Sequence, residues 1–275
     1  MSNILIIKHG SLGDLIQANG AIKDIKNFYP NRKVFLLTTQ PYSIFMSECP
    51  YLDGVLIDKR LPRWNLFYLN NLKKTLSKYD FSKVFDLQNS SRTKFYKRFI
   101  IKNVEWSSTE TALEPGQRKS DFDKDPVLDR MEIQLKKSGI ETEFTKNIDL
   151  SWAVDNTSHL VKNYTNREYI LLFPFCSPKL KNKKWPYYKE LIQKLKQEFK
   201  NKYSVLLAPG PNEIEEANKL NAKVVLENNE HVTLKTLVSL IHSAKLVIAN
   251  DTGPAHIASH LDKKGLVLFG SHTSA

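Results

Sequence analysis

Leu246-Val247-Ile248-Ala249-Asn250-Asp251-Thr252-Gly253-Pro254-Ala255-His256 joins an apolar run to a helix through a tight turn. The run 246–249 is typical of a strand buried in a parallel sheet. Thr252 or Asp251 can cap the helix, Gly253 lets a ligand approach the backbone, and Pro254 suits a first helical position. Free N–H groups and the helix dipole would favour an anion there, most naturally a diphosphate. An ordinary, well-capped turn explains the same residues.

Strands and helices alternate on both sides of an irregular middle, which predicts an α/β fold of doubly wound parallel sheets. Residues 107–125 are rich in Ser, Thr, Glu, Pro, Gly, Lys and Asp and predict a long mobile loop. We expect two Rossmann-like domains, over residues 1–155 and 156–275. The sequence stops just after a strand at 265–269, so we expect a truncated C-terminal end. The expected strands are 4–8, 34–38, 54–58, 84–86, 102–106, 168–173, 204–208, 223–226, 246–249 and 265–269. The expected helices are 15–28, 65–78, a basic helix after residues 88–92, 126–138, 186–200, 213–220, 234–242 and 254–261.

Bulk properties narrow the function classes. The 275 residues carry a net charge of +12 and two cysteines. No run approaches the ~20 apolar residues of a membrane span, and the N-terminus lacks the features of a signal peptide, so a cytoplasmic location is the default. The positive charge suits nucleic acid, anionic lipid or a phosphorylated substrate. No zinc-finger spacing or aromatic ribonucleoprotein pattern is present, and we expect no nucleic-acid partner.

A second glycine-rich turn, Gly10-Ser11-Leu12-Gly13-Asp14, follows the first strand. It lacks the G-x-G-x-x-G pattern of dinucleotide-binding proteins and the Gly-Lys-Ser/Thr of a phosphate-binding loop. What remains is one carboxylate, Asp14, at a helix start on the carboxyl edge of a sheet, where ligands bind in this architecture. Asp14 either meets a ligand or only caps its helix.

Two other segments carry candidate chemistry. Residues 177–186 contain four lysines, which favour either a phosphate site or a solvated basic loop. Glu213 could accept hydrogen bonds from a ribose or a base, or be a first-turn helix charge. His256 and His260 are four apart, but Ile257 stands where H-E-x-x-H has its glutamate, and no third ligand is evident. We expect no metal site.

Taken together, three motifs resemble those of glycosyltransferase family 9, the bacterial ADP-heptose:lipopolysaccharide heptosyltransferases. They are Ser-Leu-Gly-Asp at 11–14, Lys-Lys-Trp-Pro at 183–186 and Asp-Thr-Gly-Pro-Ala-His at 251–256. Val-Phe-Asp-Leu-Gln at 84–88 is also similar to a strand of the family. The resemblance implies a GT-B fold, with two Rossmann-like domains facing a central cleft. It also implies inverting sugar transfer from a nucleotide donor, most simply ADP-linked, without a metal or other cofactor.

The resemblance also implies a role for each matching residue. Asp14 would be the general base that takes the proton of the acceptor hydroxyl. Lys183 would neutralise donor phosphate, and the backbone at Thr252 and Gly253 would hold the diphosphate. The remaining implied contacts are Asp251, His256, Glu213 and Ser177 on the donor side, and Ser11, Gly13 and Arg92 on the acceptor side.

The sequence departs from the family at two places. The loop before Lys183 lacks the Thr-Ser/Thr-Arg run that is frequent in the family. Where the family usually has an aspartate-containing segment after Phe-Gly-Pro, this chain reads Phe269-Gly270-Ser271-His272.

On the acceptor side, basic residues of the first domain would attract an anionic lipid-linked oligosaccharide at the inner face of the cytoplasmic membrane, or only aid solubility. These residues are Lys59, Arg60, Arg63, Arg92, Lys94, Lys97, Arg98 and Lys102.

The resemblance implies a cytoplasmic, peripherally membrane-associated heptosyltransferase of lipopolysaccharide biosynthesis. It would move heptose from ADP-heptose to a lipopolysaccharide core acceptor, with Asp14 as the base. The alternative is a non-catalytic nucleotide-sugar or glycolipid binding protein with the same fold.

Overall fold

The computed structural model describes residues 2–200 and 202–271. The chain forms two compact units, Met1–Asp149 and Leu150–Ala275. Each contains one five-stranded sheet, and every strand pairing in both sheets is parallel. The predicted class, two α/β units with doubly wound parallel sheets, is therefore confirmed. The division between the units falls a few residues before the expected position.

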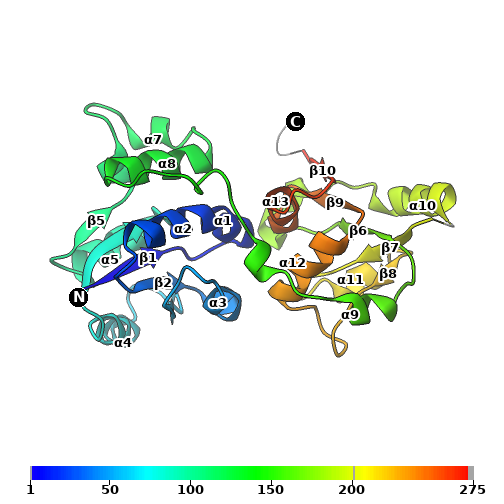
Figure 1. The fold of residues 1–275 in the computed structure, drawn as a ribbon, viewed down its shortest axis with the longest axis horizontal. Coiled ribbons are helices and arrows are strands. Elements are labelled where there is room, and N and C mark those ends of the chain that lie inside the picture. The colour runs from blue at the N-terminus through cyan, green and yellow to red at the C-terminus, as the bar shows by residue number, and fades with distance from the viewer. Residues whose placement is uncertain (1, 201, 272–275) are drawn as a thin grey trace. The chain divides into compact units, whose positions relative to one another are not determined.

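The first sheet has the strand order β3-β2-β1-β4-β5 (Figure 1). Its central strand is wholly apolar after Asn3, and it pairs with β2 on one side and β4 on the other. Because all five strands are parallel, their carboxyl ends share one edge of the sheet. The strands are β1 Asn3–Ile7, β2 Val34–Thr38, β3 Gly54–Ile57, β4 Phe81–Asp86 and β5 Glu105–Ser107.

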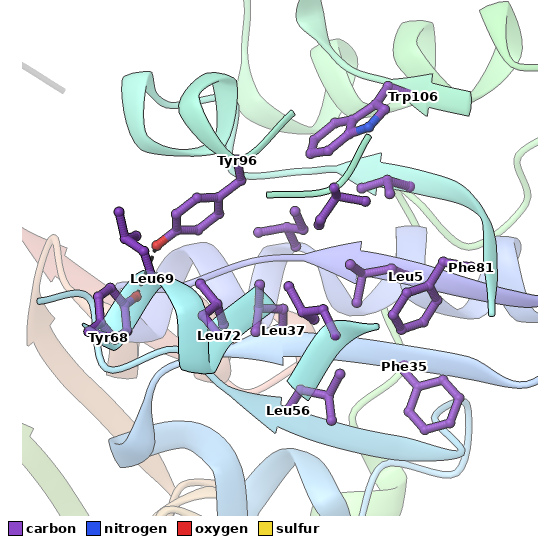
Figure 2. Packing of buried hydrophobic residues seen from close by; sticks show 14 residues of the cluster. Leu5, Phe35, Leu37, Leu56, Tyr68, Leu69, Leu72, Phe81, Tyr96 and Trp106 are labelled. Atoms are coloured by element: carbon purple, nitrogen blue, oxygen red, sulfur yellow. Dashed lines mark hydrogen bonds between the residues drawn. The ribbon is translucent and has the colours of Figure 1, made fainter. Parts of the chain in front are cut away.

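Helices cover both faces of this sheet, as the continuous apolar strands require. Leu5 and Ile7 point to the face packed by α4 and α5, where they join Tyr68, Leu72 and Tyr96 in one cluster (Figure 2). The opposite face includes Phe85, whose ring meets Tyr29 at the end of α2. The helices are α1 Leu12–Gln17, α2 Asn19–Phe28, α3 Gln40–Ser47, α4 Leu66–Leu76, α5 Ser91–Phe99, α6 Thr109–Ala112, α7 Lys119–Phe122 and α8 Val127–Lys137.

The expected loop at 107–125 is wrong in part, because this segment contains α6 and α7. The hydroxyl of Thr111 accepts the N–H of Ser108 at 2.9 Å, and the Phe122 side chain is buried. Packing of Phe122 therefore overrides the polar composition that favoured a loop. The helix expected over 15–28 begins earlier, at Leu12, and is divided at Ala18 into α1 and α2.

A buried carboxylate fastens the end of the first unit to α2. Asp24 accepts the backbone N–H groups of Glu143, Phe144 and Thr145 at 2.8–3.1 Å, and the Thr145 hydroxyl at 2.7 Å. Asp24 is only 4% exposed. These bonds satisfy backbone donors that have no secondary structure to satisfy them, so one side chain orders the segment that follows α8.

The second sheet has the order β10-β9-β6-β7-β8. One of its faces packs against α10 and α11, where Ile170, Leu172, Val205 and Ile248 meet Tyr188 and Ile192. In Figure 1, α12 and α13 lie side by side, and each contacts the other. The strands are β6 Tyr169–Phe173, β7 Ser204–Leu207, β8 Lys223–Val224, β9 Leu246–Asn250 and β10 Gly265–Leu268.

Of the four helices expected in the second unit, α10 and α11 are shorter than predicted, α12 ends one residue later, and α13 begins and ends one residue earlier. The helices of this unit are η1 Ser151–Ala153, α9 Ser158–Lys162, η2 Pro178–Lys183, α10 Tyr188–Phe199, α11 Ile214–Asn218, α12 Leu234–Ser243 and α13 Gly253–His260, where η marks a 3₁₀ helix. The short elements η1, α9 and η2 were not predicted. Within the described parts of the chain, none of the helices is both long and apolar enough to cross a membrane.

We expect Asp24→Ala to lower the free energy of unfolding of the first unit by about 3 kcal/mol, because several buried N–H groups lose a charged acceptor. Urea titration followed by circular dichroism measures the change. The exposed Asp80 provides the matched control, Asp80→Ala. Equal stability of the two variants would contradict the anchoring role of Asp24.

Candidate functional site

In the first unit, the candidate site is the turn that follows β1. Its residue His9 is held through both backbone groups: its N–H donates to Gln88 Oε1 at 2.8 Å, and its carbonyl accepts from Thr39 Oγ1 at 3.0 Å. Gln88 follows β4 and Thr39 follows β2, the two strands that flank β1. The neighbouring strands therefore fix where the turn begins.

Gly10 is required by the shape of this turn. Its φ is +105°, a conformation that residues with a side chain rarely adopt. A Cβ atom here would also lie 2.3 Å from Cε2 of Tyr42, a residue of α3. Burial raises the pKa of Tyr42, and the charge of Asp14 raises it further, so this phenol stays protonated beside the turn.

Asp14 closes the first turn of α1. Its Oδ2 accepts the Ser11 N–H at 2.9 Å and the Ser11 hydroxyl at 3.0 Å. Its Oδ1 lies 3.9 Å from Nζ of Lys8, and the side chain is 41% exposed. The capping interpretation therefore describes an interaction that is present. A carboxylate has about four acceptor positions, so capping does not use up its capacity, and the base role stays a prediction.

Lys8 is a buried cation beneath the turn. Its Nζ donates to the carbonyl of Leu87 at 3.0 Å. Burial lowers its pKa, while the carboxylates of Asp14 and Asp86 oppose that effect. Burial in turn raises the pKa of Asp86, against hydrogen bonds from Thr93 and two backbone N–H groups.

A buried polar cluster around Asp58 contacts this turn through His9. Asp58 Oδ2 accepts the Tyr96 hydroxyl at 2.7 Å and lies 2.9 Å from His9 Nε2, and Oδ1 accepts the Tyr68 hydroxyl. Burial alone would raise the pKa of this carboxyl, but the contacts with His9, Tyr68 and Tyr96 lower it to about 2. Sequence reasoning missed this residue. Its only signal was an acidic residue at the end of an apolar strand.

Arg92 belongs to the same cluster. Its guanidinium donates to the Tyr96 hydroxyl at 3.0 Å and to the carbonyls of Arg60 and Leu61 at 3.2 and 3.0 Å. Arg92, expected on the acceptor side, thus holds the loop after β3. Of the other residues expected there, Ser11 is exposed at the start of α1 and Gly13 is buried within it.

In the second unit, the candidate site lies at the carboxyl edge of the sheet. Lys183, at the end of η2, reaches the turn after β9, and its Nζ lies 2.6 Å from Asp251 Oδ2 and 3.2 Å from the Asp251 carbonyl. Both side chains are about three-quarters buried. The structure therefore brings Lys183 to Asp251, which lies 68 residues away in sequence and just ahead of α13.

Asn250 fixes the lysine-bearing segment, and sequence reasoning gave it no role. Its Oδ1 accepts the Trp185 N–H at 3.1 Å, and its Nδ2 donates to the Phe175 carbonyl at 3.4 Å. On the other side, a Cβ atom at Gly270 would lie 2.1 Å from the carbonyl oxygen of Asn182. Close backbone packing at Gly270 explains the glycine in the segment 269–272, of which His272 lies outside the described residues.

The turn itself departs from the expected cap. Thr252 is the N-cap residue of α13, but its hydroxyl donates to the Asn250 carbonyl at 3.3 Å and makes no cap bond to the helix. Gly253 begins the helix, and His256 lies in its first turn. Burial, and then the neighbouring His256, lower the pKa of His260.

Glu213 and Ser177 are the two remaining residues expected on the donor side. Glu213 accepts the Gly210 N–H at 2.7 Å and so closes its own turn, and burial raises its pKa. Ser177 is exposed and precedes η2. Among the residues that the structure describes, no three His, Cys, Asp or Glu side chains are grouped as metal ligands.

The chain is similar to several known proteins. The chain is 26% identical over 282 residues to a curated protein of Haemophilus influenzae that is provisionally named a glycosyltransferase, and the match covers 94% of this chain and 80% of that protein. Its fold matches E. coli heptosyltransferase WaaC with ADP-2-deoxy-2-fluoro heptose, at a TM-score of 0.74 and 19% identity over 99% of this chain and 90% of that one. It also matches E. coli ADP-heptose lps heptosyltransferase II, at 0.71 and 19% over 97% and 84%.

The predicted GT-B type is confirmed by these folds, each of which pairs with both parallel-sheet units of this chain. A family model, glycosyltransferase family 9 (heptosyltransferase), matches residues 69–275. The matched residues include Lys183 and the turn 250–256, whereas Asp14 lies ahead of them. The chain belongs to glycosyltransferase family 9, a family of transferases.

Proposed function

We propose that this protein transfers a heptose from ADP-heptose to a lipopolysaccharide core acceptor with inversion at the anomeric carbon. Membership of the heptosyltransferase family supports the class of reaction. The observation that carries the assignment of the donor site is the Lys183–Asp251 pair at the start of α13. It places a cation beside the positive end of a helix, as binding of a diphosphate requires.

In the second unit, Lys183 and the backbone N–H groups at Thr252 and Gly253 hold the diphosphate of the donor. These groups are fixed before binding, since Asn250 secures the segment that carries Lys183. Their positive charge stabilises the negative charge that the leaving nucleoside diphosphate gains as the glycosidic bond breaks. His256 and Glu213 serve the donor, Glu213 at its nucleoside.

In the first unit, Asp14 takes the proton of the acceptor hydroxyl as its oxygen attacks the anomeric carbon. The Asp14 Oδ2 is occupied by Ser11, so Oδ1 is the oxygen that receives the proton. The proposal includes a cytoplasmic location, with peripheral association at the inner face of the membrane. It requires no metal ion, because the phosphate charge is met by Lys183 and by the helix start.

Asp14→Asn separates the base role from the cap role. The amide oxygen of asparagine can still accept the Ser11 N–H, but an amide cannot take up the proton. We expect kcat to fall by a factor of about 10²–10⁴ while calorimetry shows unchanged donor affinity. Thermal melting tests that α1 is intact. Near-normal turnover of the asparagine variant would leave Asp14 with the cap alone.

Lys183→Ala removes the cation from the start of α13. We expect ADP to bind about tenfold or more weakly by isothermal titration calorimetry, because a charge-assisted bond to phosphate is lost. Lys184→Ala is the matched control, since the neighbouring ammonium pairs with Glu216 instead. Equal loss in the two variants would mean that general charge, rather than the position of Lys183, governs binding.

The metal-free mechanism is tested with a chelator. We expect transfer from ADP-heptose to be undiminished after treatment with excess EDTA, because no metal is needed at the diphosphate. Activity that disappears and then returns on addition of a divalent cation would overturn this part of the proposal. Donor binding without transfer to any acceptor would favour the non-catalytic alternative.

A further inference from the structure

The segment 59–67, called here the docking segment, exposes large apolar side chains. Trp64, Leu66 and Phe67 are 79%, 75% and 78% exposed. The fold does not need them, because α4 buries its inward face through Tyr68, Leu69, Leu72 and Leu76. Three neighbouring apolar side chains left in water carry a cost that a binding partner would remove.

The docking segment is firmly held, so the exposure of its side chains does not come from a loose loop. Arg92 donates to the carbonyls of Arg60 and Leu61, and the Arg60 N–H donates to Asp58 at 2.8 Å. Asn65 caps α4 by accepting the Tyr68 N–H at 2.9 Å. Figure 2 shows Tyr68 and Tyr96 on the buried side, where their hydroxyls are 3.1 Å apart. Buried polar groups thus hold the backbone while the apolar groups face outward.

The charged residues in this stretch of the chain all have the same sign. No aspartate or glutamate occurs between Lys59 and Tyr79. All the cations within this span are exposed: Lys59, Arg60, Arg63, Lys73, Lys74 and Lys78. A partner that covers the docking segment must therefore be anionic as well as apolar.

We propose that the docking segment is the surface by which this protein binds an anionic lipid bilayer. Trp64, Leu66 and Phe67 enter the interfacial region, where tryptophan and apolar side chains are favoured, and the flanking cations meet lipid phosphates. Each single contribution is modest, and the combination gives reversible, peripheral binding. A second copy of the chain fits less well, because a two-fold contact would bring the same cations against each other.

This surface lies at the functional edge of the first sheet. The docking segment begins one residue after Asp58, which contacts His9 at the start of the Asp14 turn. Docking would therefore place the membrane beside the carboxyl edge that carries Asp14. The inference deepens the peripheral association that the proposed function includes, by naming the surface that makes it. Vesicle binding tests this surface without any sugar transfer, and only its use in presenting a lipid-linked acceptor rests on the proposed reaction.

Vesicle sedimentation tests the surface without donor or acceptor present. We expect the full chain to bind phosphatidylglycerol-containing vesicles and to bind phosphatidylcholine vesicles much more weakly. Trp64→Ser combined with Phe67→Ser should lower the partition coefficient by about tenfold or more. Ile44→Ser is the control, because Ile44 is 75% exposed on α3 of the same unit and should leave binding unchanged.

The charge contribution has its own pair of variants. Lys73→Gln with Lys74→Gln should weaken binding to anionic vesicles, whereas Lys189→Gln with Lys194→Gln on α10, also exposed, should not. Raising the ionic strength from about 0.1 M to about 1 M shortens the screening length from about 10 Å to about 3 Å and should release much of the protein.

Trp64→Phe keeps the docking segment apolar and tests directly whether the Trp64 side chain enters the bilayer. It should retain binding but lose most of the fluorescence quenching caused by brominated lipids. The proposal is overturned if the serine variant binds vesicles as the parent does, if brominated lipids quench the parent and Trp64→Phe equally, or if the patch is found to mediate dimers in sedimentation velocity. Circular dichroism confirms that each variant is folded, and transfer to a soluble acceptor is measured separately.

Discussion

Both units depend on one constraint: every strand of each sheet runs in the same direction. Parallel strands need crossover helices that cover both faces, and they deliver all their carboxyl ends to one edge. In the first unit, this edge collects His9, Thr39, Asp58 and Gln88 from the ends of four strands. In the second, it collects the Lys183 segment and the turn after β9. Residues distant in sequence meet at these edges because of the strand direction.

Most of the fold could be predicted from the sequence because buried parallel strands have a clear signal. The apolar runs at 4–7, 169–173 and 246–249 are strands at the expected places. The boundaries between helices and loops were less predictable where polar residues make tertiary contacts. The segment 107–125 has a loop-like composition, yet Phe122 packs into the unit and Asn89 accepts the Thr109 N–H at 2.6 Å. The amino-acid composition of a segment does not reveal such long-range contacts.

The candidate site was predictable where motifs carry its residues, and less so where single side chains support it. The meeting of Lys183 with Asp251 follows from two motifs at the same edge. Asn250 and Asp58 are isolated polar residues at strand ends, and their partners come from elements that sequence spacing does not bring together. The contacts of Arg92 could not be predicted for a similar reason, because its bonds to the carbonyls of Arg60 and Leu61 depend on the conformation of the loop after β3.

If the donor diphosphate binds at the Lys183–Asp251 pair, as proposed, the pair has a consequence for ligand selection. The Lys183 ammonium has the Asp251 carboxylate as a counter-ion at 2.6 Å, so these two charges offset each other. An incoming anion must share this cation or exchange with the carboxylate, and a weakly charged solute gains little from either. A diphosphate can offer more negative charge and more oxygens than the carboxylate it competes with. In that binding mode, the Asp251 carboxylate would compete with the ligand for Lys183 and so favour the more highly charged anion.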